Sequence, residues 1–241
     1  MPYIQETAVC GRVVEVEKRF AARYGRPGKT RGDNTNETDP AMQVINRRLA
    51  EKKLRRLINT NFGPGDFHLV LTYRRGPEGR PEPAVARRNM ERFLRELRKF
   101  QKRRGDELRY ISVTEYRRAA IHHHMVMQAS DAAGIARLWP HGRIHVTPLD
   151  DSGNYARLAE YLIKETEGSS RKSGEPYGKR WCASKNLKKP EITVRVVPAD
   201  SWRQVPAPMK GYRILQESVV EGVHEVTGAI YQRYMMVKLR E

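Results

Sequence analysis

The chain has few cysteines, few acidic residues and no long apolar run. Only two of its 241 residues are cysteines, Cys10 and Cys182, and they form no Cys-x-x-Cys pair. Neither a disulfide framework nor a cysteine zinc site is therefore predicted. No apolar run approaches the roughly 18 residues of a membrane-spanning helix, and the N-terminus lacks the apolar core of a signal peptide. We expect a cytoplasmic protein with no membrane partner.

The shortage of acidic residues leaves a strongly basic chain. It has 28 Asp and Glu against 46 Lys and Arg, which gives a formal net charge of +18. Such an excess is typical of a nucleic-acid-binding protein, and a basic protein on a membrane surface is the competing interpretation. The length suits one domain that carries extensions.

Apolar periodicity and turn residues predict an α+β fold. Helices are expected at about 40–59, 84–102, 131–138 and 153–168, and strands at 67–73, 108–115, 120–128 and 142–149. The strands at 108–115 and 120–128 follow one another closely and are expected to form an antiparallel hairpin. The pattern favours a central, mainly antiparallel sheet flanked by helices.

Three consecutive histidines, at positions 122 to 124, lie in the second strand of this hairpin. Alternate side chains of a strand point to opposite faces, so His122 and His124 can converge on one ion while His123 points away. Glu115, at the end of the preceding strand, is the best third ligand, because its carboxylate oxygen suits Mg²⁺ or Mn²⁺. Whether Glu115 shares a face with His122 depends on the hairpin register, which the sequence leaves open.

A second candidate pair lies in the helix expected to end at residue 168. Tyr161 and Lys164 are about one turn apart and can be neighbours. An ordinary phenol, with a pKa of about 10, is a poor nucleophile at neutral pH, and a nearby lysine can favour the phenolate or stabilise charge on a phosphate. Tyr155 falls on the apolar stripe of the helix and is predicted to pack in the core. Glu165 is either a base toward water or the partner of a surface cation.

The order and spacing of these residues resemble the three motifs of the HUH endonucleases, in particular the rolling-circle replication initiators of phages and plasmids. The matching stretches are Leu71-Thr72-Tyr73, Glu115 with His122-His123-His124, and Tyr161-Leu162-Ile163-Lys164. The segment from Arg180 to Pro190 also resembles the part that follows the nucleophile helix in such proteins. The resemblance covers about residues 59–190, and His123 departs from it, because the family has a hydrophobic residue there.

The resemblance implies a chemistry. A tyrosine attacks a phosphodiester of single-stranded or hairpin origin DNA and leaves a 5′-phosphotyrosine and a free 3′-hydroxyl. Tyr161 would be the nucleophile, and Lys164 would orient the reacting groups or stabilise charge on the phosphate. Glu115, His122 and His124 would bind Mg²⁺ or Mn²⁺. No nucleotide cofactor is implied. A host helicase and the host replication machinery are the implied partners.

The resemblance also suggests a division of the chain. Residues 1–58 would form a basic arm, loosely ordered to about residue 40, and then a helix. Residues 59–200 would form the HUH endonuclease domain with its palm-like sheet. Residues 201–241 would extend this sheet or form a small accessory unit. Basic residues and a tryptophan after the nucleophile helix suit a bound single strand; they are Arg180, Trp181, Lys185, Lys188 and Lys189. Trp181 could equally be a core residue. Structural roles are expected for His68, His141, His145 and His224.

Other interpretations stay open. A relaxase or single-strand transposase of the HUH group would use the same chemistry, although in relaxases the nucleophile usually precedes the histidine motif, whereas Tyr161 follows it. A non-catalytic single-stranded nucleic-acid-binding protein would use its histidines structurally and form no covalent product. An iron oxygenase fits the ligand set but neither the charge nor the Tyr161 and Lys164 pair.

Overall fold

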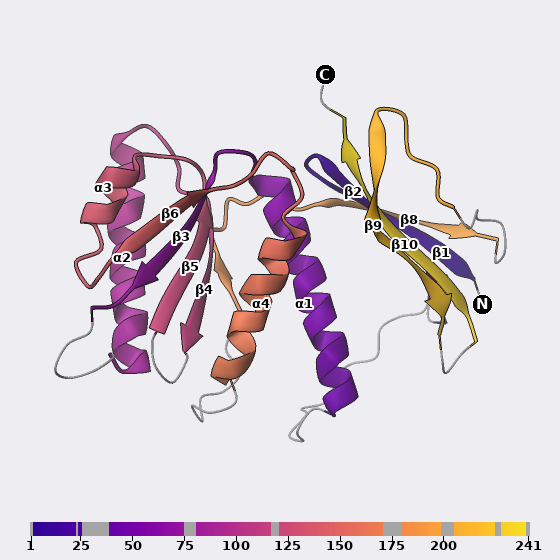
Figure 1. Cartoon of the computed structure of the whole chain (residues 1–241), viewed down its shortest axis with the longest axis horizontal. Helices are drawn as coiled ribbons and strands as arrows, with labels where there is room; N and C mark the ends of the chain where they lie inside the picture. Colours follow the sequence, from indigo (N-terminus) through magenta and orange to yellow (C-terminus); the bar gives the residue numbers. More distant parts are fainter. Residues whose placement is uncertain are drawn as a thin grey trace. The chain divides into compact units, whose positions relative to one another are not determined.

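The structure is a computed structural model that describes residues 2–22, 24–25, 39–74, 81–116, 121–170, 180–198, 205–224 and 228–239. The chain divides into two compact units. We call Ala50–Lys188 the central unit, and Met1–Leu49 together with Lys189–Glu241 the terminal unit. Each unit contains one five-stranded sheet (Figure 1). Because every described strand pair is antiparallel, the predicted α+β class is confirmed.

The central unit holds the sheet that the sequence predicts. Its strands run in the order β6-β3-β5-β4-β7. Their bounds are β3 (Phe67–Thr72), β4 (Tyr110–Tyr116), β5 (Ile121–Met127), β6 (Ile144–Pro148) and β7 (Cys182–Ala183). The helices are α2 (Pro83–Arg103), α3 (Ala132–Arg137) and α4 (Ala156–Ser170), with α1 (Pro40–Asn61) crossing the boundary of the two units. No helix in the described parts of the chain is long and apolar enough to cross a membrane.

The two faces of this sheet carry separate apolar cores. On one face, Ile111, Val113 and Val126 pack with residues of α1 and α4, among them Leu54 and Leu162. On the other face, strand residues 69, 71, 125 and 127 pack with α2 and α3. Burying one large aliphatic or aromatic side chain contributes about 1.5–3 kcal/mol. Helices therefore cover both faces of the sheet (Figure 1), and each strand presents alternate residues to a different layer.

The terminal unit overturns the expectation of a loosely ordered N-terminal arm. Residues 3–20 form a hairpin, β1 (Tyr3–Cys10) and β2 (Val13–Phe20), instead. Its two-residue connection begins at Gly11, whose φ of 61° is a left-handed value that glycine adopts without steric cost. The remaining expected arm residues from 26 to 38 lie outside the described residues.

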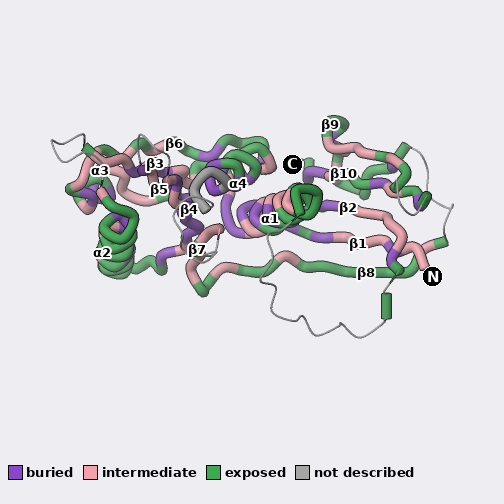
Figure 2. Tube along the Cα trace, turned by 90° about the horizontal axis from the view of Figure 1, so that it is seen from below, coloured by how far each residue is buried: buried purple, intermediate pink, exposed green. Residues whose placement is uncertain are grey.

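The hairpin pairs with strands from the other end of the chain. These are β8 (Glu191–Val197), β9 (Tyr212–Val223) and β10 (Ile230–Lys238), and the sheet order is β8-β1-β2-β10-β9. β8 is an edge strand exposed along almost its whole length (Figure 2). Strands β9 and β10 thus belong to this second sheet and do not extend the central one. The compact units accordingly do not follow the boundaries at residues 58 and 200 that the sequence suggests.

Candidate functional site

The register of the β4–β5 hairpin determines which side chains share a face. Glu115 is paired directly with His122, and Val113 with His124. Residues opposite each other in neighbouring strands project to the same face, and the alternation along β5 adds His124 to that face. Glu115, His122 and His124 therefore lie together on the side of the sheet that α1 and α4 cover. The register that the sequence leaves open is the one that places Glu115 beside both histidines.

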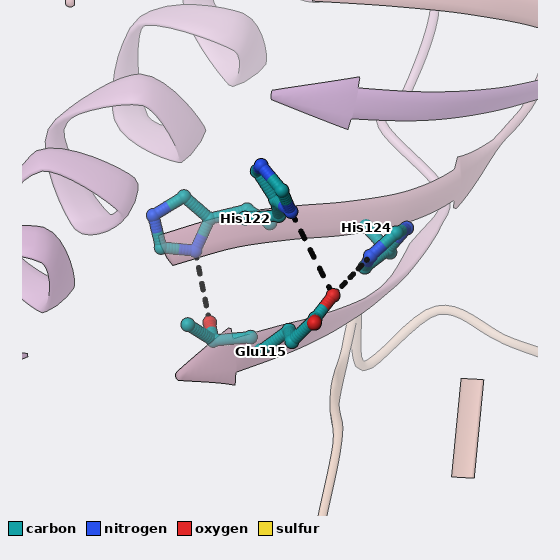
Figure 3. Close-up of polar contacts among 5 residues, drawn as sticks. Glu115, His122 and His124 are labelled. Carbon is teal, nitrogen blue, oxygen red and sulfur yellow. Dashed lines mark hydrogen bonds and ion pairs between the residues drawn. The ribbon is translucent and has the colours of Figure 1, made fainter. Parts of the chain in front are cut away.

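One carboxylate oxygen lies between the two imidazoles. The Oε2 atom of Glu115 is 3.3 Å from Nε2 of His124 and 3.7 Å from Nδ1 of His122 (Figure 3). Glu115 and His124 are buried, whereas the His122 side chain is 34% exposed. The cluster thus has two members fixed by packing and a third that reaches solvent.

One carboxylate and two imidazoles can together bind a divalent ion, but these donors are further apart than the ligands of a bound ion. Adjacent ligands in an octahedral Mg²⁺ shell are about 3 Å apart, given metal–oxygen bonds of about 2.1 Å. Both nitrogen–oxygen distances in the cluster are longer, and among the described residues no group of three His, Cys, Asp or Glu is arranged to hold a metal ion as it stands. Binding of an ion would therefore require these side chains to move closer together.

Tyr161 lies beside this cluster. Its neighbours in α4, Leu162 and Ile163, are buried in the core, whereas Tyr161 is 42% exposed. The rings of Tyr161 and His124 meet edge to face, with centroids 5.4 Å apart and planes at 87°. Lys164, about one turn further along α4, is exposed. Tyr161 therefore combines an exposed side chain with a ring contact to the cluster.

His68 is a member of the site that the sequence interpretation missed. Its ring stacks on His124, with centroids 5.6 Å apart and planes at 18°, and lies 6.5 Å from the Tyr161 ring. Burial, followed by the nearby His124, lowers the pKa of His68 to about 4. Its Nε2 atom is buried and has no hydrogen-bond partner among the described residues. The sequence carries no signal for it, because its place on this face follows from the pairing of Thr72 with His122, and Thr72 is two alternations after His68 on β3.

His123 points to the opposite face, as predicted, and has a structural environment. It is 0% exposed, and its two ring nitrogens lie 3.0 Å from the Tyr73 hydroxyl and 2.9 Å from the Thr114 hydroxyl. A neutral imidazole offers one donor and one acceptor, which these two hydroxyls can complement. Burial lowers the pKa of His123 to about 3 and raises the pKa of Tyr73 to about 12. The tyrosine of the Leu-Thr-Tyr stretch thus holds the middle histidine in the core.

Two further residues of the α4 region are also buried. Tyr155 is 4% exposed, and its hydroxyl donates to the Asp150 carbonyl at 3.0 Å, which confirms the prediction that Tyr155 packs in the core. Glu165 is 6% exposed and so lies inside the protein rather than at the surface.

The basic segment after α4 is fixed to the end of α1. Asn61 donates to the Lys188 carbonyl at 2.9 Å and accepts from the Lys188 amide at 2.7 Å. Trp181 is partly buried and packs against the core between the sheet and helices α1 and α4. Lys185, Lys188 and Lys189 are exposed, and Arg180 is partly exposed. Of the two interpretations of Trp181, core packing is the one that this contact favours.

No curated protein and no solved structure was found to match the chain. One family does match: residues 66–166 fit the family described as Replication-associated protein ORF2/G2P. The matched segment begins just before β3 and ends within α4, so it includes Glu115, His122, His124 and Tyr161. This stretch of the chain is thus similar to replication-associated proteins, as its sequence motifs predict.

Proposed function

We propose that the protein is a metal-dependent, site-specific endonuclease that nicks and rejoins single-stranded DNA and so initiates rolling-circle replication of a plasmid or phage. The observation that carries the proposal is the convergence of Glu115, His122 and His124 beside Tyr161, within the segment that matches the replication-associated family. The net charge of +18 suits a polyanionic substrate.

Tyr161 is the proposed nucleophile. Its phenolic oxygen attacks the phosphorus of a phosphodiester, the bond from phosphorus to the 3′ oxygen breaks, and the released 3′ oxygen takes up a proton. The product is a 5′-phosphotyrosine, and attack on it by a 3′-hydroxyl restores the phosphodiester. Lys164, exposed on the same helix, is proposed to stabilise the negative charge that develops on the phosphate.

Glu115, His122 and His124 are the proposed ligands of Mg²⁺ or Mn²⁺. When bound, the ion would act as a Lewis acid toward the phosphoryl oxygens of the substrate. Burial fixes Glu115 and His124 in place, and the edge-to-face contact of His124 with Tyr161 orients the phenol relative to the ligands. His68, stacked behind His124, supports this arrangement.

The exposed cations after α4 are proposed to bind the DNA strand. Lys185 and Lys188 are held in a segment that the Asn61 hydrogen bonds anchor, and we include Arg180 and Lys189 in the same role. Trp181, which packs against the core, is not included. Unwinding of the duplex is assigned to a host helicase acting with the host replication machinery.

Covalent trapping tests the nucleophile. Labelled single-stranded oligonucleotides that tile the DNA around the coding sequence are incubated with the protein and Mn²⁺ and separated by denaturing electrophoresis. Wild type should form a protein–DNA adduct, and Tyr161→Phe should form none while it retains DNA affinity. Tyr155→Phe is the matched control and should still form the adduct, because Tyr155 is a core residue. An adduct from Tyr161→Phe would disprove the assignment, and no adduct from wild type would favour a non-catalytic binding protein.

Ligand substitution tests the metal. His124→Ala and His122→Ala should abolish both the adduct and the binding of Mn²⁺ measured by calorimetry, with most DNA binding intact. His145→Ala, an exposed histidine on β6, is the matched control and should bind Mn²⁺ as wild type does. An equal loss of DNA binding in the ligand variants would point to structural histidines.

A further inference from the structure

The sheet of the terminal unit carries a groove on one face. It has a volume of about 370 Å³ and lies between the strands and the segment 206–209. Its polar lining comes from Gln5, Thr7, Lys18 and Arg195, and its apolar lining includes Tyr234. All of these residues belong to the terminal unit, so the groove is formed without any residue of the candidate nicking site.

A row of polar side chains crosses the sheet, and three of its five members line the groove. Strand register aligns one residue from each of the five strands, in the order Arg195, Gln5, Lys18, Gln232 and Glu221. Arg195 donates to Gln5 at 3.2 Å, Lys18 donates to Gln232 at 2.9 Å, and Gln232 donates to Glu221. Arg195 therefore lies at one end of the row and Lys18 at its centre, and the carboxylate of Glu221 lies at the other end, on β9.

Lys18 and Arg195 lie on the same face of the sheet with Gln5 of β1 between them, and both line the groove. Burial lowers the pKa of Lys18, the positive charge of Arg195 lowers it further, and Glu221 acts in the opposite direction. No carboxylate is among the residues that line the groove in the described part of the chain. Two like charges held in a groove repel each other, and an anion placed between them would remove that repulsion.

The lining matches one class of ligand. A guanidinium and an ammonium beside a neutral amide and a hydroxyl match the oxygens of a phosphate group, since charge-assisted hydrogen bonds to phosphate are short and strong. The adjoining wall is apolar, with Val16, Met236 and the aromatic Tyr234. A nucleotide combines a phosphate with a flat, largely apolar base, and so it fits both parts of the groove.

We propose that this groove binds a nucleotide unit of single-stranded DNA, with its phosphate between Lys18 and Arg195. The choice of DNA as the polymer rests on the proposed function, whereas the choice of a phosphate rests on the two cations. The terminal unit is thereby a second DNA-binding element of the chain, in addition to the cations that follow α4.

Arg195 offers a clean test because it is exposed on an edge strand. A matched control is Arg213, an exposed arginine of the same sheet. Arg213 pairs with Val237, which pairs with Val13, and this register places it on the opposite face from Lys18. Arg195→Ala and Arg213→Ala change the net charge equally. A difference in DNA affinity between these two variants therefore reports binding in the groove and not the overall charge.

The measurement is the anisotropy of a labelled single-stranded oligonucleotide, titrated at several NaCl concentrations with full-length protein. All variants carry Tyr161→Phe, so that covalent trapping does not interfere. Arg195→Ala should weaken binding by about tenfold and lower the slope of log K against log salt by about 0.7. Arg195→Lys should retain most of the affinity, and Arg213→Ala should bind as the parent does. Circular dichroism of each variant checks folding, and Arg195→Gln replaces Arg195→Ala if the latter is unfolded.

Each outcome decides the proposal. If Arg195→Ala and Arg213→Ala weaken DNA binding equally, the proposal that the groove binds a nucleotide is wrong. If RNA of the same sequence binds more tightly than DNA, the assignment of DNA as the bound polymer is wrong. Adduct formation by protein with Tyr161 intact is scored separately. Selective loss of binding in Arg195→Ala without any wild-type adduct would leave the groove standing and refute the nicking proposal. An adduct from wild type, with no selective loss of DNA binding in Arg195→Ala, would support the nicking proposal and refute the groove proposal.

Discussion

Replacement of His123 by leucine should change how the stability of the protein depends on pH. The His123 imidazole is fully buried, and burial lowers its pKa to about 3 from an ordinary value of 6.5. The ionisable groups close to it are Tyr73, His122, His124 and His141. Between these two pKa values the unfolded chain binds a proton at this position and the folded chain does not. Stability should therefore fall as the pH falls from 6.5 toward 3.

The size of this effect follows from proton linkage. At pH 5 the proton taken up by the unfolded chain at this one position lowers the free energy of unfolding by about 2 kcal/mol relative to pH 8, and the loss approaches about 1.4 kcal/mol per further pH unit. His123→Leu removes this loss. At neutral pH the variant should nevertheless be the less stable protein, because the Tyr73 and Thr114 hydroxyls lose a buried partner at a cost of about 1–3 kcal/mol each.

Urea unfolding followed by circular dichroism at pH 7 and pH 5 measures both effects. Between the two pH values wild type should lose about 2 kcal/mol more than His123→Leu, within a transition that stays two-state. Met125→Ala, a buried substitution two residues away in the same strand, is the control and should lower stability equally at both pH values. Parallel pH dependences of wild type and His123→Leu would refute the assignment of a neutral buried imidazole.

Three further substitutions have defined outcomes. His68→Ala leaves a cavity beside the His124 ring, on which His68 stacks, so the yield of the covalent adduct should fall several-fold at unchanged DNA affinity. An unchanged adduct yield in a gel assay would show that His68 does not support the site. Asn61→Ala removes both hydrogen bonds to the Lys188 backbone and should lower the free energy of unfolding by about 1–3 kcal/mol in urea titrations, whereas a wild-type midpoint would contradict this. Gly142→Ala places a Cβ against the Thr72 carbonyl and should lower the free energy of unfolding by about 1–3 kcal/mol or more. A wild-type melting temperature of this variant would show that the backbone around Gly142 can move away from Thr72.

The elements of the central unit were predictable because their apolar positions repeat with the period of a helix or a strand. The α2 stripe of Phe93 and Leu97 and the alternation around His123 are local signals of this kind. The pairing of Glu115 with His122 was not predictable, because register depends on how the whole hairpin packs against α1 and α4. His68 was missed for the same reason, since it joins the site only through its pairing across to β5.

Of the terminal unit, the β1–β2 hairpin was missed for a different physical reason. Its hairpin places polar side chains such as Gln5 and Lys18 on one face, and Glu15 is buried on the other, so hydropathy alone does not identify the strands. The partners that complete the sheet, β8 and β10, lie far away in the sequence. Long-range pairing of this kind has no signature within a short window of residues.

The assembly of the terminal sheet from both ends of the chain imposes an order on folding during synthesis. Strands β1 and β2 leave the ribosome first, but the strands on either side of them in the sheet, β8 and β10, begin only at Glu191 and Ile230. The whole central unit is translated in between, and it can fold as soon as Lys188 has emerged. Until β8 and β10 have been synthesised, the first hairpin has two unpaired edges, and these are the places where a nascent chain is most open to pairing with the wrong strand.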